Sequence, residues 1–287
     1  MLKKISNTLL AVIFFVTLTS NTFAATISTE NKSISVHQQV LDKISGNLVL
    51  ENNKVNLDVN NTENLEDEEL AIIPEVLEDL NFLYQKGNIY FDSNDNLAVR
   101  AKEELEEELE EYLDEIEENN NDSYESDIMP IPGFDEPENF ALERYVKANS
   151  QYLTNYYNDY VDLMIKYPSL IILPQLETQI EFASKVAEGK AWDYKREIGW
   201  NTLRKVTIDG KPHYLTGEDI GNIHYGYIGR DMDFSTATLC KAGGLVQVLT
   251  SKGASLKQFS YDSYYDDPTD QAAIKRGTSW YDNGSFK

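Results

Sequence analysis

The spacing of apolar and polar residues in the C-terminal half of the chain predicts a mainly helical fold with one small β-hairpin. Apolar residues recur with helical spacing in several segments that contain no helix breaker, as in helices with one buried face. Between these segments, Asp209-Gly210 separates two short runs of alternating apolar residues, which is a strong local signal for a hairpin. Helices are predicted at residues 139–167, as one helix or a bent pair, at 176–188 and 235–249, and from Asp267 onward, and the hairpin at residues 205–216. This pattern indicates the α+β fold class.

The N-terminal half follows a different pattern. Residues 25–65 are rich in Asn, Ser and Thr and low in aromatic residues, so we expect a poorly ordered leader. A helix is predicted at 73–83, a strand, turn and strand at 88–99, and a second helix at 101–118. The second helix has a stripe of Leu and Ile and carries Glu at nearly all remaining positions, which fits either a solvated face or an acidic cover for a basic cleft elsewhere. The N-terminal region is therefore expected to be acidic, partly helical and partly disordered.

The first 24 residues have the features of a secretory signal peptide. Lys3 and Lys4 precede an apolar run at residues 9–18, and Ala24 ends a small-residue cleavage pattern. The run falls short of the roughly 20 apolar residues that a permanent bilayer span needs, which disfavours the alternative of an uncleaved anchor. We expect a secreted protein with no stable membrane span after cleavage. The predicted organisation is a signal peptide at 1–24, a leader at 25–65, an acidic helical and hairpin region at 66–118, a linker at 119–138 and a C-terminal domain at 139–287.

The charge of the chain is unevenly distributed. The chain has 49 acidic and 25 basic residues and a net charge of -24, which argues against bulk attraction to nucleic acid or an anionic membrane. Residues 25–140 hold 31 acidic and 6 basic residues, whereas residues 141–287 hold 18 and 17. The objection to a nucleic-acid partner therefore does not apply to the C-terminal half. We expect residues 25–140 to fold back over that half and restrain it electrostatically.

Cysteine usage excludes two classes of small domain. Cys240 is the single cysteine, so no intramolecular disulfide can form, and no cluster of Cys and His exists for a structural zinc site. Its place beside Leu239 in a predicted helix favours a small core residue over a thiol nucleophile.

Four short blocks stand out in the C-terminal half, and all but the Ala242-Gly243 pair with Gln247 are richer in Trp, Gly, Asp and Gln than packing requires. They are Trp192-Asp193-Tyr194-Lys195, Gly221-Asn222-Ile223-His224-Tyr225-Gly226 with Gly229, Ala242-Gly243 with Gln247, and Asp266-Asp267-Pro268-Thr269-Asp270-Gln271 with Ile274 and Gly277. In this order they resemble the bacterial polymorphic toxin type 44 domain family, over residues 145–281. The resemblance implies that the C-terminal domain is the toxic domain of a secreted effector in interbacterial conflict. It further implies a nuclease that acts on RNA and a cognate immunity protein as partner.

If RNA is the substrate, the histidines are candidates for proton transfer. Metal-free RNA cleavage needs a base for the 2′ hydroxyl, an acid for the leaving oxygen and cations for the phosphate, and His suits both proton roles near neutrality. His37 lies in the expected leader and His213 on the hairpin, which leaves His224, expected in a Gly-rich turn. The alternative is a histidine satisfied by backbone groups at a tight turn. Asp193 and Asp270 are acids that could orient His224, and Lys195 lies in the same block as Asp193. The candidate catalytic residues are therefore His224, Asp193, Asp270 and Lys195.

Other residues beside these blocks are suited to bind substrate. Arg230, Lys275 and Arg276 can contact phosphate groups, and Gln271 can orient a reacting group. Tyr225 and Trp192 can stack on bases, although core packing is the ordinary role of such residues. We expect no metal or other cofactor; the alternative is a divalent ion held by Asp266, Asp267 and Asp270.

Three functions stay open at this point. The first is a secreted toxin that hydrolyses RNA. The second is a toxin that acts on peptidoglycan or a lipid-linked cell-wall precursor, with Asp266 and Asp270 as acid and base. The third is a non-enzymatic envelope protein that binds glycans or partners.

Overall fold

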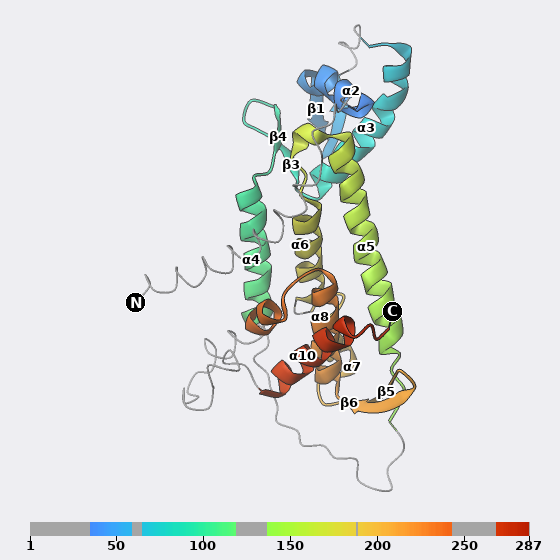
Figure 1. Cartoon of the computed structure of the whole chain (residues 1–287). Coiled ribbons are helices and arrows are strands. Elements are labelled where there is room, and N and C mark those ends of the chain that lie inside the picture. The colour runs from blue at the N-terminus through green and yellow to red at the C-terminus, as the bar shows by residue number, and fades with distance from the viewer. Residues whose placement is uncertain (1–34, 59–64, 119–136, 188, 243–267, 287) are drawn as a thin grey trace, which may run out of the picture. The chain divides into compact units, whose positions relative to one another are not determined.

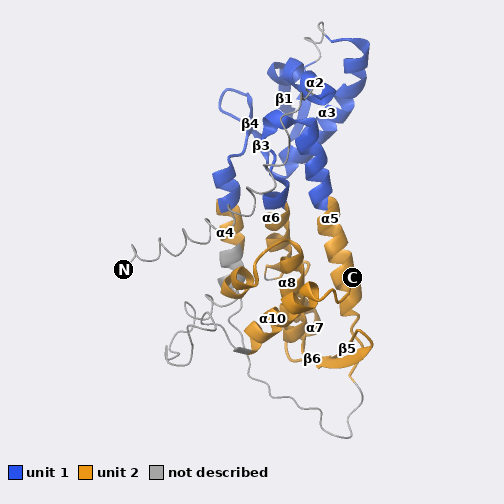
Figure 2. Ribbon diagram, viewed as in Figure 1, with its two compact units in different colours: residues 1–106, 156–177 blue, residues 107–155, 178–287 orange. Residues whose placement is uncertain are grey.

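The chain forms two compact units (Figure 2). The computed structural model describes residues 35–58, 65–118, 137–187, 189–242 and 268–286. Unit 1 comprises residues 1–106 and 156–177, and unit 2 comprises residues 107–155 and 178–287. The predicted signal peptide and nearly all of the predicted linker at 119–138 lie outside the described residues. Within the described residues, no helix is both long and apolar enough to cross a membrane.

Unit 1 is built from helices and two short antiparallel hairpins (Figure 1). Its first elements are α2 (Val36–Ile44), a 3-10 turn (Ser45–Asn47), β1 (Leu48–Glu51), β2 (Lys54–Leu57) and α3 (Asp67–Gln85). They are followed by β3 (Ile89–Phe91), β4 (Leu97–Val99), the start of α4 (Lys102–Glu118), the end of α5 (Leu142–Lys166), a 3-10 turn (Pro168–Leu170) and the start of α6 (Pro174–Val186). In register, Leu48 pairs with Leu57 and Ile89 with Val99.

The helix, hairpin and helix predicted between residues 73 and 118 are confirmed by α3, β3, β4 and α4. Helix α3 starts earlier than the apolar spacing predicted. The reason is a capping contact, in which the Glu69 carboxylate accepts a hydrogen bond from the Glu66 backbone N–H at 3.0 Å. The Lys43 ammonium group lies 2.5 Å from the same carboxylate.

The leader predicted at residues 25–65 is only partly described, and residues 35–58 differ from the expected poor order. They form α2, β1 and β2. Val40, Leu41 and Ile44 lie on one face of α2 and are almost completely buried. Three apolar residues at helical spacing are enough to anchor a short helix in a core, even in a segment of polar composition. His37 therefore lies on an ordered helix.

The core of unit 1 draws residues from both sides of the predicted linker at 119–138. Helices α2 and α3 contribute one part, which includes Ile44, Leu80 and Leu83. The end of α5 and the following turn contribute Tyr160, Leu163, Tyr167, Leu170 and Ile172. The two units consequently do not divide at the predicted linker.

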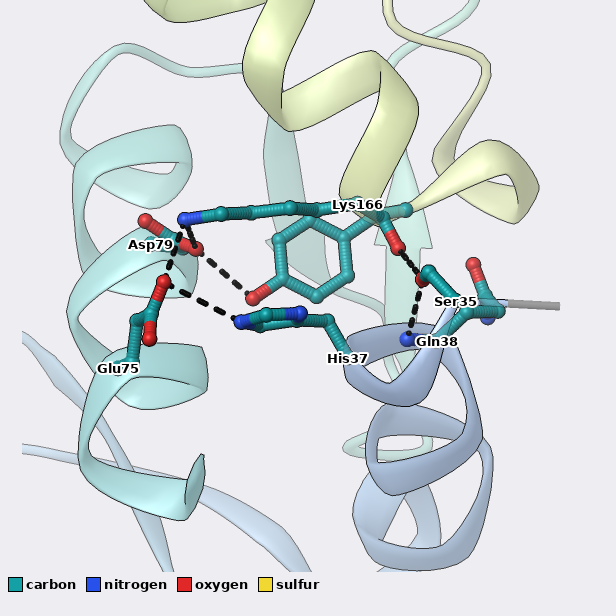
Figure 3. Close-up of polar contacts among 7 residues, drawn as sticks. Ser35, His37, Gln38, Glu75, Asp79 and Lys166 are labelled. Carbon is teal, nitrogen blue, oxygen red and sulfur yellow. Dashed lines mark hydrogen bonds and ion pairs between the residues drawn. The ribbon is translucent and has the colours of Figure 1, made fainter. Parts of the chain in front are cut away.

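A polar network joins three helices within unit 1 (Figure 3). Lys166 Nζ lies 2.7 Å from Glu75 Oε1 and 2.9 Å from Asp79 Oδ2. The Tyr167 hydroxyl donates to the same Asp79 oxygen at 2.9 Å, and His37 Nε2 lies 3.2 Å from Glu75 Oε1. Burial opposes the charge of Lys166, but the hydrogen bonds to the two carboxylates outweigh it and raise the pKa of Lys166. The network fixes the end of α5 to α2 and α3.

Among the described residues, unit 2 contains the remaining helices and one hairpin. They are α7 (Tyr194–Ile198), β5 (Arg204–Ile208), β6 (Lys211–Leu215), α8 (Gly217–Asp231), a helical segment at 236–242 and α10 (Pro268–Asp282), together with the end of α4, the start of α5 and the end of α6. The predicted hairpin is confirmed, and both Asp209 (φ 50°) and Gly210 (φ 75°) adopt the left-handed conformation of its turn. The helices predicted at 139–167 and 176–188 are confirmed as α5 and α6. Of the helix predicted at 235–249, residues 243–249 lie outside the described residues.

The Gly-rich block at residues 221–229 is helical, so the predicted turn was wrong. Thr216 caps α8, its hydroxyl accepting a hydrogen bond from the Asp219 backbone N–H at 3.1 Å, and the helix runs through the whole block. The glycines let α8 and α10 approach closely (Figure 1). A Cβ atom on Gly226 would lie 2.3 Å from the Ile274 carbonyl oxygen, and one on Gly277 would lie 2.1 Å from the Ile223 carbonyl oxygen. Glycine is used here for backbone contact between helices.

Candidate functional site

His224 lies at the centre of an aromatic cluster in unit 2. It projects from α8 and is completely buried. The rings of Tyr194 and Trp192 meet it edge-on, with centroid distances of 4.7 and 5.8 Å. Asn149 of α5 completes the surroundings, because its Nδ2 lies 2.8 Å from His224 Nε2 and 2.9 Å from the Tyr194 hydroxyl oxygen. The structure thus brings together two predicted site residues, His224 and Trp192.

The hydrogen bond at Nε2 and the burial of the ring together indicate the protonation state of His224. The Asn149 amide nitrogen can only donate, so His224 Nε2 accepts and Nδ1 carries the proton of the neutral ring. Nδ1 is buried and has no hydrogen-bond partner among the described residues. Complete burial lowers the pKa of His224 from its ordinary value of 6.5 to about 3. At neutral pH the side chain is therefore an N–H donor, and the pKa argument that suggested it as a base does not hold at this depth.

A second cluster, formed by Tyr152, Glu181 and Lys185, lies next to Trp192. The Tyr152 hydroxyl donates to Glu181 Oε1 at 2.5 Å, and Lys185 Nζ lies 3.2 Å from the same oxygen. Burial and the neighbouring Glu181 carboxylate raise the pKa of Tyr152, so the phenol keeps its proton. The Tyr152 ring meets Trp192 edge-on at 5.9 Å. One aromatic ring, that of Trp192, thus touches both His224 and this cluster.

The Glu181 cluster was not predicted from the sequence. The apolar pattern of residues 176–188 correctly indicated an amphipathic helix, but Glu181 sits between the inward-facing Ile180 and Phe182 and is itself 9% exposed. Burial of a carboxylate cannot be inferred from helix periodicity alone, because Tyr152 comes from another helix, α5. The available signal was the Glu and Lys spacing of four residues on one helix face.

Asp193 stabilises the turn that carries Trp192. Its Oδ2 accepts a hydrogen bond from the Gly189 backbone N–H at 2.8 Å and lies 3.2 Å from Arg196 Nε. The other oxygen, Oδ1, is buried and has no hydrogen-bond partner among the described residues. The contacts of Asp193 are therefore with its own turn and with α7.

Three further predicted residues hold neighbouring elements together. Lys195 Nζ lies 4.8 Å from the centroid of the Trp200 ring, a cation–π contact. Asp270 Oδ1 accepts a hydrogen bond from Asn222 Nδ2 at 2.9 Å, which joins α10 to α8 two residues from His224. Gln271 is buried and donates to the Cys240 carbonyl oxygen at 2.7 Å.

The remaining substrate-binding candidates occupy different environments. Arg230 Nε lies 3.0 Å from Asp282 Oδ1, whereas Lys275 and Arg276 are exposed on α10. Tyr225 is buried and stacks on Phe182 at 5.8 Å, which is a packing role. Cys240 is also buried, which confirms its prediction as a core residue.

Two residues of the alternative metal site, Asp266 and Asp267, lie outside the described residues. Within the described part of the chain, no group of three or more His, Cys, Asp or Glu side chains is arranged to hold a metal ion.

The C-terminal part of the chain matches a bacterial toxin domain. Residues 181–283 match the family model of Ntox44, bacterial toxin 44, as the four sequence blocks predicted. The match begins at Glu181 and contains Trp192, His224 and Asp270. No curated protein and no solved structure matches the chain. A bacterial toxin domain is compatible with a cognate immunity protein.

Proposed function

We propose that the chain is a secreted toxin of interbacterial competition whose C-terminal unit hydrolyses phosphodiester bonds in RNA. The observation that carries the proposal is the Glu181 cluster beside Trp192, which combines a carboxylate, a cation and a protonated phenol within hydrogen-bond distance. The cluster reaches solvent, since Tyr152 is 40% exposed, so a substrate can approach it.

In this proposal the 2′ hydroxyl of the substrate loses its proton to the Glu181 carboxylate. The 2′ oxygen forms a bond to phosphorus, the bond from phosphorus to the 5′ oxygen breaks, and a 2′,3′-cyclic phosphate results, which a water molecule then opens to complete the hydrolysis. The 5′ oxygen leaves with a proton from the Tyr152 hydroxyl or the Lys185 ammonium group, and Lys185 offsets the phosphate charge. His224 and Asp193 act as positioning residues, because both hold Trp192 or its turn.

The test compares Glu181→Gln with the control Glu197→Gln, an exposed acid of α7. We expect that residues 25–287, produced in the bacterial cytoplasm, arrest growth and degrade RNA. Glu181→Gln should slow cleavage of purified RNA by about 100-fold or more, the usual effect of losing a general base, while Glu197→Gln cleaves at the wild-type rate. Equal activity of the two variants would contradict the assigned base.

The same experiment separates the cell-wall function from RNA hydrolysis. The predicted signal peptide favours a substrate outside the cytoplasm, so the chain is also produced with residues 1–24 retained. Growth arrest only on export, with RNA intact, would support peptidoglycan or a lipid-linked precursor as the substrate. No arrest in either compartment would support a non-enzymatic envelope protein.

A further inference from the structure

An open groove with a volume of about 690 Å³ lies in unit 2, where the chain enters α5. Its walls are the first turns of α5 and strand β5, and it is separate from the predicted site residues. The segment before α5 is fixed to β5, because the Phe140 backbone N–H donates to the Lys205 carbonyl at 2.9 Å and the Lys205 N–H donates to the Glu138 carbonyl at 3.0 Å. Backbone pairing on both sides of Asn139 therefore sets the shape of the groove.

The groove is cationic in a chain that is strongly acidic. Arg144, Lys147 and Lys205 line it, against one lining acid, Glu143. The Glu143 carboxylate lies 2.8 Å from Lys147 Nζ. Three cations and one acid give the lining a net charge of +2, and the Arg144 and Lys147 side chains are exposed to a ligand.

Packed aromatic rings connect the groove wall with His224 inside unit 2. Phe140 lines the groove and stacks on Tyr145, with a centroid distance of 5.0 Å and an interplanar angle of 5°. Tyr145 meets Tyr194 edge-on at 5.1 Å, and Tyr194 meets His224 at 4.7 Å. The groove and the candidate site thus share one continuous set of packed rings.

We propose that this groove binds the phosphate backbone of single-stranded RNA, with Arg144 and Lys147 as the phosphate contacts and Phe140 as a stacking platform. Cations that follow the backbone, combined with an aromatic ring that accepts any base, are how proteins hold single strands without sequence preference. The inference rests on the proposed function, since RNA is the substrate proposed there.

The experiment measures binding separately from cleavage. The probe is a fluorescein-labelled oligouridine with methylated 2′ hydroxyls, which cannot be cleaved through the 2′ oxygen. The full chain, the double variant Arg144→Gln/Lys147→Gln and the control Lys190→Gln/Lys211→Gln are compared by fluorescence anisotropy at several salt concentrations. Both doubles lose two exposed positive charges of unit 2, and urea unfolding verifies that each is folded.

We expect the groove variant to bind about tenfold more weakly or worse, and the slope of log K against log salt to become shallower by roughly 1.4, because two phosphate contacts are lost. The control should keep the wild-type slope. An equal loss in both variants, an unchanged slope in the groove variant or no binding by the wild type would overturn the inference. Cleavage of unmodified RNA by the wild type is measured in parallel. If the wild type binds through the groove but does not cleave RNA, the proposed hydrolysis is wrong and the groove assignment stands. If the wild type cleaves RNA and the groove variant binds as tightly as the wild type, the groove assignment alone is wrong.

Discussion

His224 shows how burial changes the chemistry of a single residue. In solution an imidazole exchanges protons near neutrality, whereas His224 is enclosed by Trp192, Tyr194 and Asn149 and stays neutral. An unpaired buried N–H costs roughly 1–3 kcal/mol, and unfolding releases that cost. Residues that carry such a cost are frequent at functional sites.

Stability of unit 2 should fall as the pH falls from 6.5 toward 3. In this window the unfolded chain binds a proton at residue 224 and the folded chain does not, so the free energy of unfolding decreases by roughly 1.4 kcal/mol per pH unit. All three tryptophans, Trp192, Trp200 and Trp280, lie in unit 2, so urea unfolding followed by tryptophan fluorescence reports on it. Between pH 7.5 and 5, wild type should lose about 2 kcal/mol more than His224→Gln, whose amide still accepts from Asn149. Identical pH dependence in both proteins would show that residue 224 is not the group responsible.

At the residue level, the sequence identified side chains that are capable of catalysis or binding, but it did not reveal their environments. Trp192 and His224 were selected from separate blocks, and they are in contact. Asn149 and Glu181 were missed, because their importance arises from contacts between α5, α6 and α8 that no local pattern records.

Helices α8 and α10 show which secondary-structure elements can be predicted from local sequence patterns and which cannot. Amphipathic spacing and the Asp-Pro signal are local, so α5, α6 and the start of α10 near residue 268 could be predicted. The block around Gly226 was read as a turn because glycine serves two purposes, backbone freedom in loops and close backbone contact in helices. Which of the two purposes applies at Gly226 becomes clear only from the helix that packs against it, α10.

The contact between α8 and α10 should tolerate no side chain at Gly226. Gly226→Ala would place a Cβ 2.3 Å from a backbone oxygen of α10, which only movement of a helix relieves, so we expect a loss of roughly 1–3 kcal/mol. Gly221→Ala, in the same helix, meets Lys195 at 3.4 Å and should change stability by less than about 1 kcal/mol. Urea unfolding followed by tryptophan fluorescence distinguishes them. Similar effects of the two substitutions would argue against a glycine-dependent helix contact.

The uneven distribution of charge is a property of the whole molecule. The excess of acids lies within residues 25–140, yet the core of unit 1 combines residues before and after the predicted linker. Composition reveals charge along the chain, but it cannot reveal which distant segments share a core. Removal of residues 25–140 is therefore a poor test of electrostatic restraint, since it also removes the partners of Tyr160 and Leu163.

A charge-neutralising variant provides the better test. Glu103, Glu107 and Glu111 are exposed on one face of α4, and replacing all three with Gln leaves the helix otherwise unchanged. If the acidic region restrains the toxin, RNA cleavage should rise at roughly 20 mM salt and match wild type at roughly 300 mM, where exposed charges are screened. Cleavage rates that agree with wild type at both salt concentrations would exclude restraint by these acids.

Helix α5 also limits how the toxin can be recombined with other proteins. Its first part supplies Asn149 and Tyr152 to the candidate site, and its last part supplies Tyr160 and Lys166 to unit 1. A fusion junction placed in the segment 119–138 would transfer α5 without the helices that cover its end, leaving apolar residues exposed and prone to aggregation. The portable cassette, in domain shuffling or in engineering, therefore has to include α2 and α3 together with the toxin domain.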